Sequence, residues 1–126
     1  MYRFHIESIL SGFLTRTHLL ILGLVVANLF FTVIANSSFK LSAQSVALSR
    51  FIFWQVIGNL AGFATVIILT LLLRSLPLSI AFPLTTGLGV IGVQVFASRM
   101  FFNEPISTAH WLGTFLIFLG ILLLGR

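Results

Sequence analysis

The chain has 126 residues, of which 59% are apolar and only 7% are charged, whereas soluble domains carry about 25% charged residues. This composition excludes a soluble globular protein and indicates a membrane protein. Two acidic residues and no cysteine leave no carboxylate pair, hard-metal cage or thiolate for chemistry, so we expect no catalytic residues, no metal and no cofactor. The net charge of +5 comes from scattered basic residues, which suit lipid phosphates better than a nucleic-acid partner.

Residues 1–18 differ from the rest because charged side chains are interleaved with apolar ones. Their apolar residues recur at helical spacing and predict an amphipathic helix over residues 3–16, too short and too charged to span a membrane. These residues are Ile6, Ile9, Leu10, Phe13 and Leu14. A signal peptide is the alternative, but no cleavage site of small residues closes a short apolar core.

Four apolar runs follow, at about residues 19–39, 51–73, 78–101 and 106–124, each close to membrane-spanning length. They predict an all-α membrane protein: an N-terminal interfacial segment, 1–18, and a transmembrane domain of four helices, 19–126. The loops are short, so we expect successive helices to be antiparallel neighbours. Four basic residues fall on the N-terminal side and three on the other, which favours a cytoplasmic N-terminus only slightly and leaves dual topology open.

The first span carries a polar stripe. Asn28, Thr32, Asn36 and Lys40 stand four residues apart and therefore share one helix face that ends in a cation. Polar side chains inside a membrane mark a functional site when they face protein, water or substrate. The alternative is that the amide and hydroxyl groups join helices by hydrogen bonds while the lysine reaches to the headgroups.

The other spans offer mainly small residues. Gln55, Gly58, Asn59 and Gly62 of the second span predict close packing with one interhelical hydrogen bond. The third span holds helix breakers and polar residues that predict a deformable, hinge-like helix with a groove. The fourth carries two glycines on one face, which predict the dimer contact, and His110 at its start suits the membrane interface. The hinge and packing positions are Pro83, Gly87, Gly89, Gly92, Gly113 and Gly120.

Three stretches carry a family resemblance. The run 77–83 (PLSIAFP), then Asn103-Glu104-Pro105-Ile106-Ser107, then His110-Trp111-Leu112-Gly113, resembles the second half of the small four-helix members of the drug/metabolite transporter superfamily. The resemblance covers residues 19–126 and is strongest to the paired flippase subunits that move aminoarabinose-linked undecaprenyl phosphate. Those subunits have a lysine where this chain has Lys40. The resemblance implies a transporter that works in a dimer.

The small multidrug resistance family is similar in its third helix, at residues 80–82 and 87–90, but has a different function. Its proton-coupling glutamate would fall on Thr32, and its substrate-contacting tyrosine and tryptophan on Phe82 and Thr85. A threonine does not titrate, so these departures speak against proton-coupled cation efflux.

The resulting hypothesis is a flippase of the bacterial inner membrane, working as a homodimer or as a heterodimer with a paralogous small subunit, among membrane lipids. Its cargo would be an anionic lipid such as a polyprenyl-phosphate-linked sugar. The expected substrate-binding residues are Lys40, Asn36, Thr32, Asn28, Arg99 and Glu104, with Lys40 neutralising the phosphate, helped by Arg50 or Arg99. Two alternatives stay open. One is cation efflux, which would need an intramembrane anion, either from Glu104 dipping into the membrane or from a partner; the other is a non-transporting subunit of a larger complex.

Overall fold

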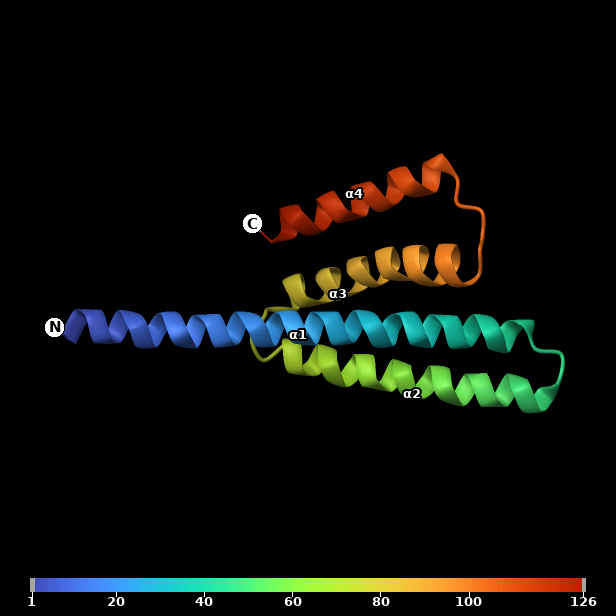
Figure 1. Cartoon of the computed structure of the whole chain (residues 1–126), viewed down its shortest axis with the longest axis horizontal. Helices are drawn as coiled ribbons and strands as arrows, with labels where there is room; N and C mark the ends of the chain where they lie inside the picture. The colour runs from blue at the N-terminus through green and yellow to red at the C-terminus, as the bar shows by residue number, and fades with distance from the viewer. Residues whose placement is uncertain (1, 126) are drawn as a thin grey trace.

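A computed structural model shows the described chain, residues 2–125, as an all-helical protein (Figure 1). Side chains are described at residues 7, 8, 11 and 12 and from Thr15 onward. The helices are α1 (Tyr2–Gln44), α2 (Leu48–Leu72), α3 (Leu78–Gly92), the π-helix η1 (Val93–Phe101) and α4 (Thr108–Leu124). η1 continues α3 directly, because Gly92, which precedes it, keeps a helical backbone.

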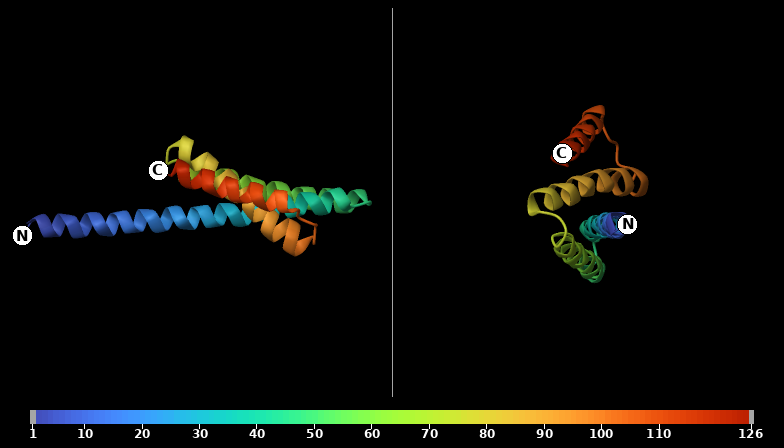
Figure 2. Two further views of the ribbon diagram at one scale, coloured as in Figure 1. Left: turned by 90° about the horizontal axis from the view of Figure 1, so that it is seen from above. Right: turned by 90° about the vertical axis from the view of Figure 1, so that its left-hand side faces the viewer.

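The helices form an open array in the spatial order α2, α1, α3, α4 (Figures 1 and 2). α1 and α2 make the largest contact, α3 packs on α1, and α4 packs mainly on α3. Successive helices alternate in direction, as expected from the short loops (Figure 1). The expectation that they are also neighbours is wrong for α2 and α3, which touch little because the turn between them carries the chain across α1.

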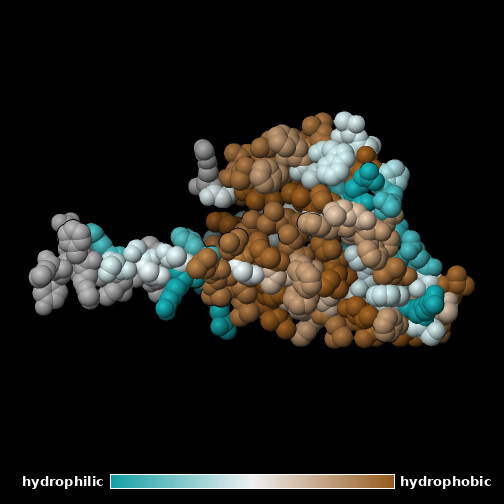
Figure 3. All heavy atoms as spheres, viewed as in Figure 1, coloured by the Kyte–Doolittle hydropathy of each residue, from teal (hydrophilic) through white to brown (hydrophobic). Residues whose placement is uncertain are grey.

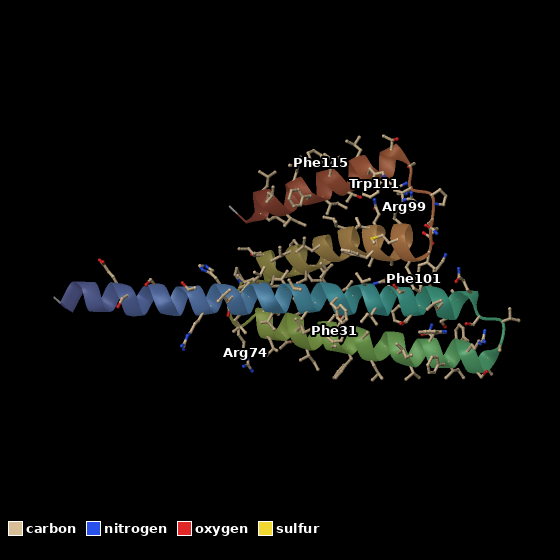
Figure 4. The ribbon with its side chains drawn as sticks, viewed as in Figure 1. Phe31, Arg74, Arg99, Phe101, Trp111 and Phe115 are labelled. Atoms are coloured by element: carbon tan, nitrogen blue, oxygen red, sulfur yellow. The ribbon has the colours of Figure 1, made fainter. Side chains whose placement is uncertain are left out.

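The buried apolar core is small and lies where α1, α2 and α3 meet. Val25, Ile68 and Leu72 form its centre, and Phe31 packs against them between α1 and α2 (Figure 4). Most large apolar side chains of the described chain are instead exposed, such as Phe63, at 64%, and Leu123, at 73%. In water such a surface would be unstable, so hydrocarbon must cover it.

On the face shown in Figure 3, polar residues gather at the right-hand end and along the coloured part of the N-terminal extension of α1, and an apolar belt crosses the middle. Within the described chain, three helical stretches are long and apolar enough to cross a membrane: Thr15–Gln44, Leu48–Leu72 and Leu78–Phe101. Thr108–Leu124 is a shorter apolar helix. Arg74 and Arg99 lie at opposite ends of this belt (Figure 4). The fold is that of a multi-pass membrane protein.

The N-terminal segment does not form a separate helix. Residues 2–44 make one continuous helix whose first part extends beyond the other helices (Figure 1). The apolar face predicted for an interfacial helix, at residues 6, 9, 10, 13 and 14, lies outside the side chains that the structure describes. The boundary between residues 18 and 19 therefore carries no break in the helix, and the interfacial role stays a prediction.

Candidate functional site: a polar groove beside α1

An open cavity of about 600 Å³ lies between α1, α2, α3, η1 and the start of α4. Three members of the predicted polar stripe, Asn28, Thr32 and Asn36, line it from α1. α2 contributes Thr65, and the third helix contributes Thr85, Thr86, Gln94 and Ser98. The stripe therefore faces a hollow rather than lipid, and the hydroxyl and carboxamide groups in this hollow lie among apolar side chains such as Leu69, Phe82 and Ile106.

Hydrogen bonds along α1 hold the stripe in place. Asn28 is 5% exposed, and its Nδ2 donates to the backbone oxygen of Thr65 on α2 over 3.1 Å. Thr32 Oγ1 donates to the Asn28 backbone oxygen over 2.7 Å, and Asn36 Nδ2 donates to that of Thr32 over 2.9 Å. Each carboxamide has two N–H donors and an oxygen, so exposed Asn36 keeps hydrogen-bonding capacity for a ligand. Asn28 joins helices, as the alternative interpretation proposed, and lines the cavity as well.

Close approach of α3 to α1 depends on two glycines. A Cβ at Gly89, itself a lining residue, would lie 3.2 Å from Thr32 Cγ2. A Cβ at Gly92 would collide with Leu29 Cδ1. Larger residues at either position would push α3 away from α1 and change the width of the cavity.

The third helix changes to π geometry where it borders the cavity. Wider turns close i→i−5 hydrogen bonds, and the last one runs from the Phe102 N–H to the Ala97 oxygen over 2.9 Å. Gln94 and Ser98 project from η1 into the cavity lining. The sequence predicts a deformable helix from all the breakers and polar residues of this span. Pro83 lies inside α3, and the change to π geometry begins at Val93.

The loop from η1 to α4 places a carboxylate at the cavity. Asn103 takes a left-handed conformation, with φ 52°, as is typical of a residue that ends a helix. The Glu104 N–H then donates to the Ser98 oxygen over 2.8 Å. α4 begins at the N-cap Ser107, whose side chain accepts from the His110 N–H. Glu104 and His110 both line the cavity.

Lys40 pairs with this carboxylate. Its Nζ lies 3.1 Å from Glu104 Oε1, and the two side chains are 46% and 41% exposed. Lys40 itself is not a lining residue; it reaches the cavity through Glu104. The charged end of the stripe is therefore an ion pair between α1 and the η1–α4 loop rather than a lone cation.

The remaining predicted site residues lie elsewhere. Arg99 is exposed on the last turn of η1 (Figure 4) and does not line the cavity. A Cβ at Gly87 would lie 2.6 Å from Ile121 Cδ1, so Gly87 is a contact between α3 and α4. A Cβ added at Gly113 or at Gly120 would meet no neighbouring atom within 4 Å, which leaves their face of α4 open.

The prediction that the second span packs closely through its glycines and forms an interhelical hydrogen bond is only partly right. A Cβ added at Gly58 would collide with the Phe39 ring, whereas a Cβ added at Gly62 would have no neighbouring atom within 4 Å. Asn59 Nδ2 donates within its own helix, to the Gln55 oxygen over 2.7 Å, so the expected interhelical hydrogen bond from this pair is absent among the bonds of the described chain. Hydrogen bonds between α1 and α2 come instead from Asn28 Nδ2 to the Thr65 oxygen and from Ser42 Oγ to the Phe51 oxygen.

Among the polar lining residues, Thr65 was missed and His110 was misplaced by sequence reasoning. Thr65 gave no signal, because its hydroxyl is one of several along α2. His110 was expected at the membrane interface but also borders the cavity, because the loop folds the start of α4 back beside η1. Its backbone oxygen lies 3.5 Å from Gln94 Nε2.

Comparison with known proteins agrees with the fold. The family model described as "Small Multidrug Resistance protein" matches residues 19–117, which excludes the N-terminal segment. The solved structures give no match.

Several curated relatives carry the name "Probable 4-amino-4-deoxy-L-arabinose-phosphoundecaprenol flippase subunit ArnE". That of Enterobacter sp. (strain 638) is 30% identical over 86 residues, which cover 68% of this chain and 78% of the relative. That of Pseudomonas syringae pv. syringae (strain B728a) is 46% identical over 57 residues, 44% of this chain and 50% of the relative. That of Aeromonas salmonicida (strain A449) is 38% identical over 72 residues, 57% of this chain and 61% of the relative.

The chain thus spans between half and two thirds of the length of the latter two relatives. The family model matches residues 19–117 and the Enterobacter relative covers 68% of the chain, in agreement with the resemblance seen in the sequence. The chain is similar to the relatives named as ArnE flippase subunits, and it belongs to the Small Multidrug Resistance protein family.

Proposed function

We propose that the protein is a small transporter of the bacterial inner membrane that flips an anionic lipid-linked substrate, such as a polyprenyl-phosphate-linked sugar, as part of a dimer. One observation carries the proposal: the intramembrane polar stripe of α1 lines a cavity with the polar residues of α3 and η1. Polar groups are costly in lipid unless they serve a site. The names of the ArnE relatives support the cargo class.

The residues suggest how a lipid could be held. Lys40, at the end of the stripe, would neutralise the phosphate, while Asn36 and Thr32 would offer hydrogen bonds to the polar head. A cavity of about 600 Å³ falls within the range of about 300–1,000 Å³ that small-molecule sites use. The hydrocarbon tail would stay in the bilayer on the open side of the groove.

The same proposal includes the membrane arrangement. α4 has 17 residues, which at about 1.5 Å per residue reach about 26 Å, at the lower limit for a membrane span. With α4 as a fourth span, both ends of the chain lie on one side of the bilayer. The N-terminal part of α1 would then bend onto the headgroups as an interfacial helix when lipid is present.

Cation efflux is the second candidate, and one observation favours it. Glu104 lines the cavity, so a carboxylate is available to a cation. Against this, Lys40 lies 3.1 Å from the same carboxylate and compensates its charge. Glu104 also comes from a loop, whereas the stripe position on α1 where a proton-coupling glutamate was expected is Thr32.

Transport can be measured in proteoliposomes with a fluorescent polyprenyl-phosphate sugar whose outer-leaflet pool is quenched chemically. Lys40→Ala should abolish flipping, because the phosphate would lose the cation proposed to neutralise it. Lys40→Arg should keep part of the activity. Arg74→Ala is the matched control, since Arg74 is an exposed basic residue outside the cavity lining, at the opposite end of the molecule from Arg99 (Figure 4).

A double variant separates loss of the phosphate partner from exposure of the carboxylate. If Lys40→Ala failed only because Glu104 was left unpaired, Lys40→Ala/Glu104→Ala would restore flipping, and the phosphate role of Lys40 would be wrong. Full activity of Lys40→Ala itself would favour a non-transporting subunit. Flipping of no lipid, combined with uptake of a quaternary ammonium dye, would favour cation efflux.

A further inference from the structure

Among the described residues that line the cavity, the titratable ones are Glu104 from the η1–α4 loop and His110 from the first turn of α4. No lysine or arginine is present in this described lining, and Lys40, which lies outside it, pairs with Glu104 at 3.1 Å. While His110 is neutral, the lining therefore offers an anion no cation of its own. Histidine ordinarily gains its positive charge between about pH 8 and about pH 5, so His110 can supply the missing charge.

A hydrogen bond holds the ring of His110 against its own helix. Nδ1 lies 2.7 Å from Ser107 Oγ, and this oxygen also accepts from the His110 backbone N–H over 3.3 Å. The bond at Nδ1 suits both protonation states, because the hydroxyl donates to the neutral ring and accepts from the charged one. Protonation therefore adds charge without displacing the ring, and Nε2 is the ring nitrogen that stays available to a ligand.

Few other charges surround this imidazole. α4 carries no other titratable residue, and α3, on which α4 mainly packs, carries none. η1 contributes Arg99, which does not line the cavity, and the neutral Gln94, whose Nε2 donates to the His110 backbone oxygen over 3.5 Å. The described lining residues of α1 and α2 are all uncharged. The charges near His110 are therefore Glu104 and, through it, Lys40.

We infer that His110 is a second contact for the phosphate of the transported lipid and that it binds this phosphate in its protonated form. The inference rests on the proposed function, in which the cargo is an anionic lipid, and adds a proton that enters the site with the phosphate. A bound anion favours the charged imidazole, and protonation in turn favours the anion, because the two equilibria are linked. Affinity should therefore rise as the pH falls through the range in which histidine titrates.

The expected effect is modest because His110 is exposed. Water reaches the ring, so protons exchange freely, but water also weakens the attraction between exposed charges. We expect binding about threefold tighter at about pH 6 than at about pH 8. The ligand chemistry is a phosphodiester, which keeps its single negative charge across this range. Two lipids supply it: a polyprenyl-phosphate sugar and phosphatidylglycerol.

The test is equilibrium binding of radiolabelled lipid to the whole purified protein in micelles of an uncharged detergent, at about pH 8 and about pH 6 and at constant ionic strength. The probes are phosphatidylglycerol, a polyprenyl phosphate linked to a neutral hexose, and the same hexose joined to the polyprenol without phosphate. The phosphodiester whose affinity changes with pH identifies the lipid. The phosphate-free analogue reveals any effect of pH on the fold or the micelle.

Wild-type protein should bind one phosphodiester about threefold more tightly at the lower pH, and the phosphate-free analogue equally at both. His110→Gln keeps a hydrogen-bonding side chain that cannot become charged, so its affinity should be the same at both pH values. His18→Gln is the matched control and should keep the wild-type ratio, because His18 is an exposed histidine of α1 outside the cavity lining.

Proton uptake gives a second, direct measurement. In weak buffer near neutral pH, binding of the phosphodiester should remove protons from solution with wild-type protein and with His18→Gln, but not with His110→Gln. A merely structural role of His110 would not produce this difference.

Three results would overturn the inference. They are equal wild-type affinity at both pH values for both phosphodiesters, a pH dependence that persists in His110→Gln, and the same pH dependence with the phosphate-free analogue. In each case, tighter binding of a phosphodiester than of the analogue would still support the proposed function. If neither phosphodiester bound more tightly than the analogue at either pH, the proposed function and the inference would both fail.

Discussion

At the scale of single residues, two asparagines of α1 show how one residue type serves two purposes. Asn28 is buried, at 5% exposure, and its amide joins α1 to the Thr65 oxygen of α2. Asn36, two turns further along the same face, is exposed and bonds only within α1. Stability therefore depends more on the first asparagine, and ligand binding more on the second.

Asn28→Ala should lower the free energy of unfolding by about 1 kcal/mol, in the range found for interhelical hydrogen bonds in membranes. Asn36→Ala should leave unfolding nearly unchanged but weaken binding of the polyprenyl-phosphate lipid a few-fold, by about 1 kcal/mol for a lost hydrogen bond. Denaturant titration in mixed micelles measures the first, and native mass spectrometry measures the second. If the two variants exchanged their effects, the assignment of roles along the stripe would be wrong.

A second residue-scale prediction concerns the width of the cavity. In Gly89→Ala the new methyl group would lie 3.2 Å from Thr32 Cγ2, so Thr32 or the helix must shift by a few tenths of an ångström. The gain in helix propensity, about 1 kcal/mol, should preserve stability while lipid binding falls about threefold, or about 0.6 kcal/mol. Gly23→Ala is the control, because Gly23 is an exposed residue of α1 and a Cβ added there would have no neighbouring atom within 4 Å. Equal binding by both variants would contradict this.

At the scale of elements, the π-helix is the feature that shapes the groove. A π turn holds more residues than an α turn, so η1 shifts the register of everything after it, including the Phe102 and Glu104 N–H groups that bond to Ala97 and Ser98. Such segments are frequent at functional sites. Here the shift puts Ser98 and the start of the η1–α4 loop on the cavity side.

Deleting Phe96, an exposed residue of η1, should let the segment return to α geometry and turn the following residues by about 100°. Ser98 and Glu104 would then lose their place at the cavity. Flipping of the fluorescent polyprenyl-phosphate sugar should fall at least about tenfold, or about 1.4 kcal/mol in the barrier, while circular dichroism stays helical. Phe96→Ala keeps the register and should remain active. An active deletion variant would show that π geometry is dispensable.

The sequence predicted the helices well but not their arrangement. Hydropathy located α2, the continuous α3–η1 helix and α4 to within three residues of their observed ends. The reason is that a long apolar run that crosses a membrane must satisfy its backbone hydrogen bonds internally, and a helix does so. It did not foresee that α1 runs unbroken through residue 18, that the third span changes to π geometry at Val93, or that α1 separates α2 from most of α3. These features depend on tertiary contacts such as Gly92 against Leu29, which hydropathy does not encode.

The candidate site was likewise predictable in part. Four-residue spacing placed Asn28, Thr32 and Asn36 on one face, and the structure brings these three together at one cavity. The pairing of Lys40 with Glu104 spans more than sixty residues, and it depends on how the η1–α4 loop turns at Asn103. No spacing rule connects positions so far apart, so the ion pair could be found only from the structure.

At the scale of the whole molecule, α4 is the least integrated helix. It packs mainly on α3, and of its described residues only Thr114 is buried. A Cβ added at Gly113 or at Gly120 would have no neighbouring atom within 4 Å, so this face of α4 is open. Small residues on an open membrane helix permit close approach of another helix, and most homo-oligomers are twofold dimers, so the predicted dimer contact on this face remains available.

Gly120→Leu should weaken the dimer at least about tenfold, or about 1.4 kcal/mol, because the added side chain would separate two closely packed α4 helices. The change meets no atom of its own chain, so the monomer should keep its fold, unlike Gly87→Leu, which would collide with Ile121 and disturb the α3–α4 contact. Gly62→Leu, at an equally open glycine of α2, is the matched control and should leave association unchanged. Dilution of labelled protein in lipid vesicles, with energy transfer between subunits as the signal, measures the dissociation constant. If Gly120→Leu associates as tightly as wild type in both vesicles and detergent, the dimer does not form through this face of α4.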